Sequence, residues 1–164
     1  SERPRLDRCP AMAFAAAQAM ARAGLTTPEL DFFDLYSCFP VAVELACEGL
    51  GISETDPRGL TLTGGLPYFG GPGNNYTLHG IAAMAEALRA KPGAAGLVTA
   101  NGWYLTKHAA GVYSSAPPSR PALPAPDPAT ARHEGGPVRV ETAPDGPAVV
   151  ETYTVVCGRS GDPE

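Results

Sequence analysis

Two segments of the chain have the punctuation of α-helices, with proline at the start and glycine at the end. Residues 11–23 follow Pro10, are rich in alanine and stop at Gly24, while residues 40–50 begin with proline and stop at Gly51. Proline suits the first turn of a helix because its missing N–H has no partner there, and glycine takes the left-handed conformation that ends a helix. The pattern predicts two helices.

Apolar runs of strand length lie between and beyond these helices. They are residues 31–36, 96–101 and 109–113. The last two are separated by a short loop, so we expect them to pair in an antiparallel way. A third helix is expected over residues 77–90. Strands that alternate with helices predict an α/β domain, and we place it over residues 1–115.

The remaining chain changes character. Six of the thirteen residues from 116 to 128 are proline, which favours an extended connector, and we predict a linker over residues 116–135. Alternation around Asp145-Gly146 then predicts a β-hairpin of residues 138–142 and 149–156. Because a two-stranded hairpin is marginally stable alone, residues 136–164 are predicted to begin a truncated small β domain.

Charge and hydropathy exclude several classes of protein. The net charge is −5, and lysine and arginine are scattered singly, which argues against a nucleic-acid surface. No apolar run approaches the roughly 18 residues of a membrane-spanning helix, and the first residues have no signal-peptide pattern. We therefore expect a soluble, cytoplasmic protein.

Cysteine spacing argues against metal and disulfide chemistry. The four cysteines are Cys9, Cys38, Cys47 and Cys157, which are too irregularly spaced for a zinc ribbon or a redox pair. Free thiols in a reducing compartment are expected, with no bound metal and no cofactor.

The strongest local signal for function is an almost uncharged, glycine-rich segment, residues 64–79, that leads into the third helix. Glycine lets backbone approach a ligand, and the N–H groups at a helix N-terminus suit an anion or a thioester oxygen. The segment matches no phosphate-binding motif. The alternative is a structural loop whose glycines serve tight turns.

A few side chains near this segment or at strand ends could carry chemistry. His79 and His108 follow glycine-containing segments, whereas His133 lies in the polar linker region. Tyr36 and Asn101 end apolar strands, where side chains are firmly held. Each has a structural alternative, as a packed or solvated histidine or as a polar group that satisfies backbone atoms. Cys38 is also near a strand end but has no basic neighbour in sequence.

Three motifs occur in the order in which one known family has them. Residues 34–39, DLYSCF, resemble the block written N-E-A-F in standard thiolases and H-D-C-F in the sterol-carrier type. Residues 64–72 resemble the loop G-G-x-x-x-x-G-H-P, and residues 96–113 resemble the final hairpin that carries C-x-G. From about Arg3 to Ser115 the chain resembles the thiolase superfamily, closest to sterol-carrier-protein-type thiolases and actinobacterial thiolase-like acetyl-CoA acetyltransferases.

The resemblance implies a fold and a partner. It implies the carboxyl-terminal half of a thiolase, a mixed five-stranded sheet with helices on its faces. The amino-terminal half, in the same polypeptide or in a second subunit, would carry the acylated cysteine, so Cys38 is not that nucleophile. The resemblance also leaves room for a homodimer.

The residues that standard thiolases use are replaced at the matching positions. The loop histidine aligns with Gly71, the N-E-A-F asparagine with Tyr36, and the C-x-G cysteine with Asn101. The predicted catalytic set is therefore Tyr36, His79, Asn101 and His108. The predicted substrate-binding set is Gly65, Gly71, Asn74, Asn75 and Trp103.

The expected function is acyl transfer between coenzyme A thioesters, as in acetyl-CoA acetyltransferases, with the fragment inactive alone. One alternative is a protein that binds CoA compounds without thiolysis. Another is an aldolase-type relative that cleaves a steroid side-chain CoA thioester, for which Tyr36 would suit proton transfer.

Overall fold

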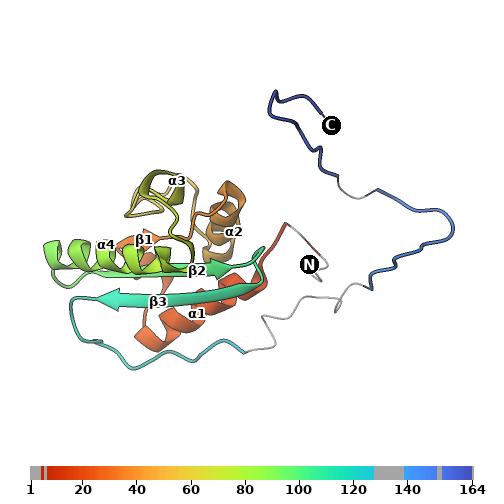
Figure 1. The fold of residues 1–164 in the computed structure, drawn as a ribbon. Coiled ribbons are helices and arrows are strands. Elements are labelled where there is room, and N and C mark those ends of the chain that lie inside the picture. The colour runs from red at the N-terminus through yellow and green to blue at the C-terminus, as the bar shows by residue number, and fades with distance from the viewer. Residues whose placement is uncertain (1–4, 6, 128–138, 151–152, 164) are drawn as a thin grey trace.

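The computed structural model describes residues 5, 7–127, 139–150 and 153–163 of the chain. Its three strands form one mixed sheet in the order β1 (Phe32–Asp34), β2 (Ala95–Gly102) and β3 (Lys107–Ser114). β1 runs parallel to β2, and β2 pairs antiparallel with β3 (Figure 1). The antiparallel pair confirms the prediction made from the last two apolar runs.

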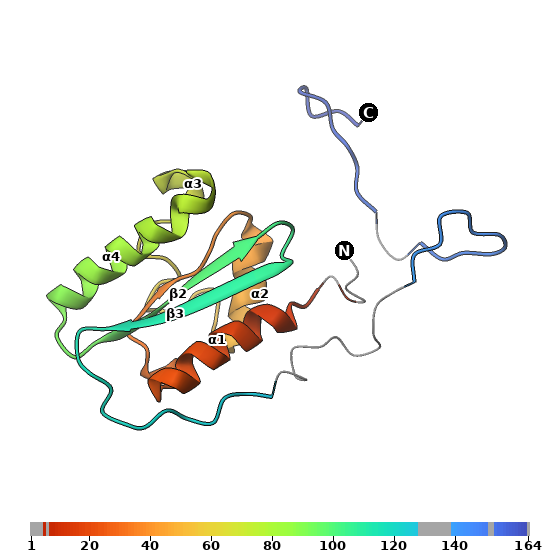
Figure 2. The ribbon, with the colours of Figure 1, turned by 60° about the horizontal axis from the view of Figure 1, so that its bottom comes forward.

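Helices cover both faces of the sheet. α1 (Pro10–Ala23) and α2 (Pro40–Leu50) lie on one face, and α4 (Tyr76–Ala90) lies on the other (Figures 1 and 2). Gly24 and Gly51 both have positive φ at the ends of α1 and α2, as their sequence positions predict. The three predicted helices are confirmed.

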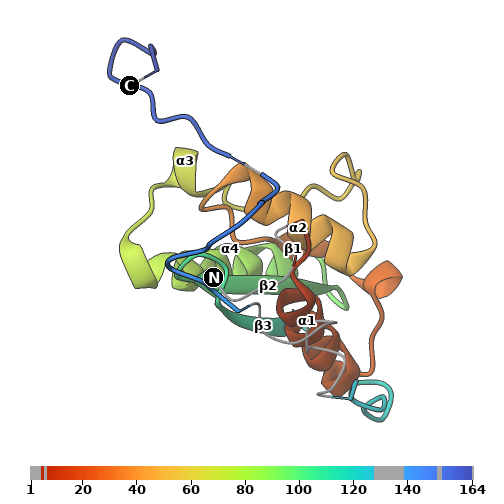
Figure 3. The ribbon, with the colours of Figure 1, turned by 90° about the vertical axis from the view of Figure 1, so that its right-hand side faces the viewer.

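The face to which each β2 side chain belongs follows from its core contacts. Leu97 packs in the core under α1 and α2, whereas Val98 packs with Met84 under α4. Side chains of a strand alternate between faces, so Thr99 and Asn101 share the α1 and α2 face with Leu97. Figure 3 shows the sheet between the two helical layers. This alternation decides how the candidate site is divided.

Short elements connect these parts. They are the 3-10 turns η1 (Thr27–Glu29) and η2 (Gly73–Asn75) and the one-turn helix α3 (Leu66–Phe69). None of the helices that the structure describes is long and apolar enough to span a membrane.

The five-stranded sheet expected from the resemblance is wrong for the described residues, which contribute three strands. Apart from those strands, the described part up to residue 115 forms helices or glycine- and proline-containing loops that have no ladder partner. The expected hairpin is also not formed: residues 139–150 and 153–156 contain no strand, and Val138, Glu151 and Thr152 lie outside the described residues. The described apolar side chains of this segment are exposed, and a two-stranded hairpin that packs against nothing else is marginally stable.

The start of the proline-rich segment lies against α1. The N–H of Leu123 donates to the carbonyl oxygen of Ala21 at 2.6 Å, and Arg120 forms an ion pair with Glu29. The first of these contacts satisfies a carbonyl in the last turn of α1. Residues 116–127 have no regular secondary structure, and residues 128–135 of the predicted linker lie outside the described residues.

Arg58 fastens the loop after α2 to the segment before β1. Its Nη1 donates to the carbonyl oxygens of Thr27 and Leu30, both at 2.9 Å, and its other nitrogens bind the Asp56 carboxylate at 2.8 Å. The guanidinium also lies 4.6 Å from the centre of the Phe33 ring. The Arg58 side chain, followed by its backbone N–H, lowers the pKa of Asp56 to about 2.

We expect this clamp to make folding stability depend on acid. Because the pKa of Asp56 is lower in the folded chain than its ordinary 3.8, its contribution is full above about pH 4 and is lost as pH falls toward 2. Thermal unfolding followed by circular dichroism should show a midpoint that falls across this window. Asp56→Asn should remove part of that fall and leave the part due to Glu29, whose pKa is also lowered to about 2. An identical slope in the variant would contradict this.

Candidate functional site

The candidate site is built on Asp34, a fully buried carboxylate at the end of β1. Its Oδ2 accepts hydrogen bonds from the N–H groups of Leu62 and Thr63 at 2.9 and 3.1 Å. The hydroxyl of Tyr76 donates to Oδ1 at 3.5 Å and also bonds to the Thr63 hydroxyl. A buried carboxylate must be satisfied in this way, so Asp34 fixes the base of the glycine-rich loop against the start of α4.

The loop then turns sharply at Gly65. Its φ is 91°, which other residues rarely adopt, and a Cβ there would lie 3.0 Å from Ser37 Oγ. The N–H of Gly65 donates to Thr63 Oγ1 at 3.1 Å, and the N–H of Leu66 donates to Ser37 Oγ at 3.0 Å. The segment after β1 therefore holds the glycine-rich loop at this end of the sheet.

A row of rings lies on the α4 side of the sheet end. Tyr36 meets Tyr76 edge-on with centroids 5.5 Å apart, and Phe69 lies 6.4 Å from Tyr76. Phe69 is in turn 5.3 Å from the His79 imidazole. Tyr36 and His79 thus belong to one cluster, joined through Tyr76 and Phe69. Burial, followed by the nearby Cys38, raises the pKa of Tyr36.

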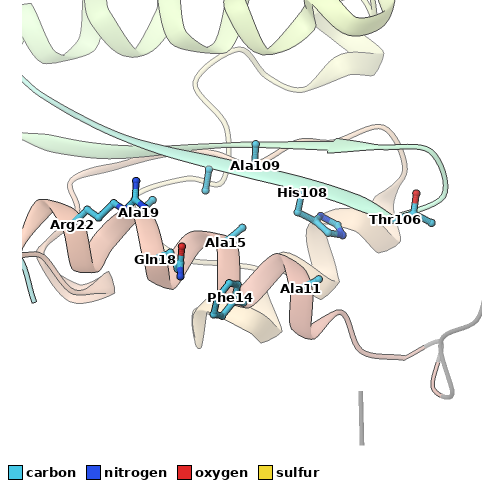
Figure 4. A pocket seen from close by; sticks show the side chains of 10 residues that line it. Ala11, Phe14, Ala15, Gln18, Ala19, Arg22, Thr106, His108 and Ala109 are labelled. Carbon is cyan, nitrogen blue, oxygen red and sulfur yellow. The ribbon is translucent and has the colours of Figure 1, made fainter. Parts of the chain in front are cut away.

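Asn101 and His108 lie on the other face. Asn101 Nδ2 is 3.6 Å from Cys38 Sγ, and Asn101 pairs with His108 across β2 and β3. His108 Nε2 lies 3.2 Å from Cys9 Sγ, at the start of α1. Figure 4 shows the imidazole directed toward α1, beside a cavity that it helps to line. Cross-strand partners share a face, so these groups form a second cluster under α1 and α2.

The predicted catalytic residues therefore meet at one end of the sheet but not in one cluster. Tyr36 and His79 lie on the α4 face, and Asn101 and His108 lie on the face of α1 and α2. The Tyr36 N–H donates to Thr99 Oγ1 at 2.9 Å and so links the two groups through the backbone. A ligand that touched all four side chains would have to pass around the strand ends.

The predicted substrate-binding residues are more open. Gly71, Asn74 and Asn75 are exposed, Gly65 is buried, and Trp103 is 79% exposed in the β2–β3 turn. Other large apolar side chains are exposed around the same end of the sheet, namely Phe39, Tyr68, Leu78 and Tyr104. This end of the sheet therefore exposes several large apolar side chains, whereas those of the core are buried.

The turn that carries Trp103 is unusual. Trp103, Tyr104 and Leu105 all have positive φ, between 50 and 60°. A left-handed conformation costs a non-glycine residue on the order of 1–2 kcal/mol. This strained turn presents the rings of Trp103 and Tyr104 to solvent.

Sequence reasoning missed the supporting residues. Asp34, Thr63 and Tyr76 hold the loop, and Cys9 contacts His108. The one available signal was the charge of Asp34 inside an otherwise apolar run. No group of three or more potential metal ligands gathers within the described ranges.

Comparison with known proteins adds a relative in structure. No protein-family model and no curated protein matches the chain. The crystal structure of a monomeric SCP2-thiolase-like protein type 1 from Mycobacterium smegmatis is 44% identical in sequence, with a TM-score of 0.72 over 83% of this chain. The chain spans 30% of the length of that protein. The present chain therefore has an α/β fold of the SCP2-thiolase-like kind.

Proposed function

We propose that the chain is the carboxyl-terminal part of a thiolase-family acyltransferase of the acetyl-CoA acetyltransferase type, and that it binds acyl-CoA thioesters. The observation that carries the proposal is the 44% identity to an SCP2-thiolase-like protein over most of the chain. In this chain Asp34 and Ser37 hold the glycine-rich loop at the end of the sheet.

The loop and the start of α4 offer the chemistry for a thioester. The first N–H groups of a helix lack partners within the helix, and its dipole favours negative charge at that end. Asn74 and Asn75 are exposed immediately before α4, and His79 follows within its first turn. In the proposal, these groups orient the thioester carbonyl or the phosphates of coenzyme A, and no cofactor is required.

The nucleophile would come from outside this chain. We propose that the amino-terminal thiolase half, in the same polypeptide or in a second subunit, supplies the cysteine that is acylated; a homodimer is compatible with this. The exposed apolar side chains at the sheet end are suited to contact such a partner. We place the activity in cytoplasmic lipid metabolism.

Tyr36 favours a second candidate. Like any tyrosine at neutral pH, Tyr36 is protonated, so the residue that replaces the thiolase asparagine has an O–H that can donate. A CoA-binding protein without thiolysis, or an aldolase-type enzyme that cleaves a steroid side-chain CoA thioester, would use such a donor. Tyr36→Phe in the parent protein would abolish aldolase-type cleavage but leave binding intact.

The chain alone should bind a CoA thioester and not turn it over. In amide NMR titrations, acetyl-CoA is expected to shift residues 64–66 and 74–79. Asn74→Ala with Asn75→Ala should weaken binding about tenfold, as expected when hydrogen bonds worth about 1.4 kcal/mol are lost, whereas Gln18→Ala on α1 should not. Acetoacetyl-CoA thiolysis should be undetectable, because covalent catalysis needs the absent nucleophile. Turnover by the chain, or shifts confined to other residues, would overturn the proposal.

A further inference from the structure

Cys9 and His108 form a contact that the proposed function does not use. Cys9 is the residue that precedes α1, and it is 6% exposed. Its Sγ lies 3.2 Å from Nε2 of His108, the second residue of β3. The two residues are 99 positions apart in sequence, so the packing of α1 on β3 brings them together.

The surroundings of the imidazole determine which atom carries the hydrogen. Nε2 is also 3.0 Å from the carbonyl oxygen of Leu105, which can only accept. Nε2 must therefore carry a proton, and its N–H is directed toward both the Leu105 oxygen and the Cys9 sulfur. A donor beside a cysteine stabilises the thiolate relative to the thiol, and the N-terminus of α1 acts in the same direction.

Two cavities flank the pair. Cys9 lines a cavity of about 140 Å³ between α1 and α2, together with Ala13 and Leu45. His108 lines another of about 420 Å³ between α1 and β3 (Figure 4). The charged groups on the smaller cavity are Arg8 and Glu48, which form an ion pair of 3.6 Å. A small uncharged molecule therefore has space beside the sulfur.

We propose that the Cys9–His108 pair is a reactive thiol site that small, uncharged carbon electrophiles modify. The Cys9 proton leaves to solvent, and the thiolate is held by the Nε2–H of His108. The sulfur then attacks the electrophilic carbon; the S–C bond forms and the bond to the leaving group breaks, with the electron pair departing on that group. The site lies apart from the glycine-rich loop, where the start of α1 packs on β3.

No imidazole contact is described for the other cysteines. Burial, followed by nearby carboxylates, raises the pKa of Cys47 and keeps it a neutral thiol. Cys38 contacts the Asn101 amide at 3.6 Å, and Cys157 is exposed. The chain thus contains its own reference thiols.

The test is site-resolved alkylation of the intact chain by iodoacetamide, with each cysteine followed by peptide mass spectrometry at pH 7 and pH 9.5. An ordinary thiol with a pKa of about 8.5 should react about 30-fold faster at pH 9.5, because its thiolate fraction rises by that factor. Cys9 is expected to change by less than about threefold. CoA compounds should not slow the reaction of iodoacetamide with Cys9 at pH 7.

His108 variants give the control. At pH 9.5 the thiol is mostly ionised, so the rate there reports how easily iodoacetamide reaches the sulfur. Dividing the rate at pH 9.5 by the rate at pH 7 therefore isolates the effect of thiolate formation. His108→Ala should restore a ratio of about 30, and His108→Gln, whose amide can still donate, should give an intermediate value. Circular dichroism checks that each variant folds. A wild-type ratio for Cys9 equal to that of Cys157, or no adduct at Cys9 at either pH, would overturn the proposal, and neither outcome bears on thioester binding at the glycine-rich loop.

Discussion

Replacing Asp34 by alanine is expected to lower the free energy of unfolding by roughly 3 kcal/mol, since each buried donor left unsatisfied costs about 1–3 kcal/mol. The variant removes the acceptor of the Leu62 and Thr63 N–H groups and of the Tyr76 hydroxyl. Chemical denaturation followed by circular dichroism measures the loss directly.

Two matched variants show whether hydrogen bonding is the cause. Asp34→Asn keeps the shape and one oxygen, so it should lose less than the alanine variant. Glu86→Gln changes an exposed carboxyl on α4 and should lose almost nothing. If Asp34→Ala behaved like Glu86→Gln, the carboxylate would not hold the loop.

Gly80→Ala is the second substitution with a large expected effect, and its direction opposes helix propensity. Alanine in place of glycine within a helix normally stabilises it by about 1 kcal/mol. At Gly80, however, a Cβ would lie 2.8 Å from Asp34 Oδ1 and 3.3 Å from its Cγ. Because three hydrogen bonds hold that carboxylate in place, we expect a net loss of roughly 2 kcal/mol, in the range for an overpacked core.

A double-mutant cycle tests this explanation. In the Asp34→Ala background the obstructing atoms are gone, so Gly80→Ala should cost little or should stabilise α4. The coupling between the two positions should exceed 1 kcal/mol, as is usual for residues in contact. Additive effects would place the cause elsewhere.

Local chemistry explains why much of the fold could be predicted. Pro10 with Gly24, and Pro40 with Gly51, mark helix ends through properties of single residues, and the structure has both helices there. The apolar run of residues 96–101 is strand-like by itself and forms β2. The segment 138–156 had alternation and a turn signal, but its described apolar side chains are exposed and its described residues form no strand.

The candidate site was harder to predict because it depends on pairings between distant segments. Tyr36 and His79 come together through Phe69 and Tyr76, whose positions follow from how the loop folds. Asn101 lies on the same face of the sheet as Leu97 because the two residues are an even number of positions apart in β2. A shift of one residue in the pairing of β2 would move Asn101 to the opposite face. The thiolase resemblance indicated which segments matter, and the register determined which side chains meet.

The fastening of Leu123 to Ala21 fixes where the rest of the chain departs. Ala21 is in the last turn of α1, beside the beginning of β2, whereas Tyr36 and Asn101 are where the strands end. Everything after Leu123 thus starts from the pole of the domain remote from the glycine-rich loop. A fluorophore or affinity handle attached directly after Leu123 would therefore be anchored away from the glycine-rich loop.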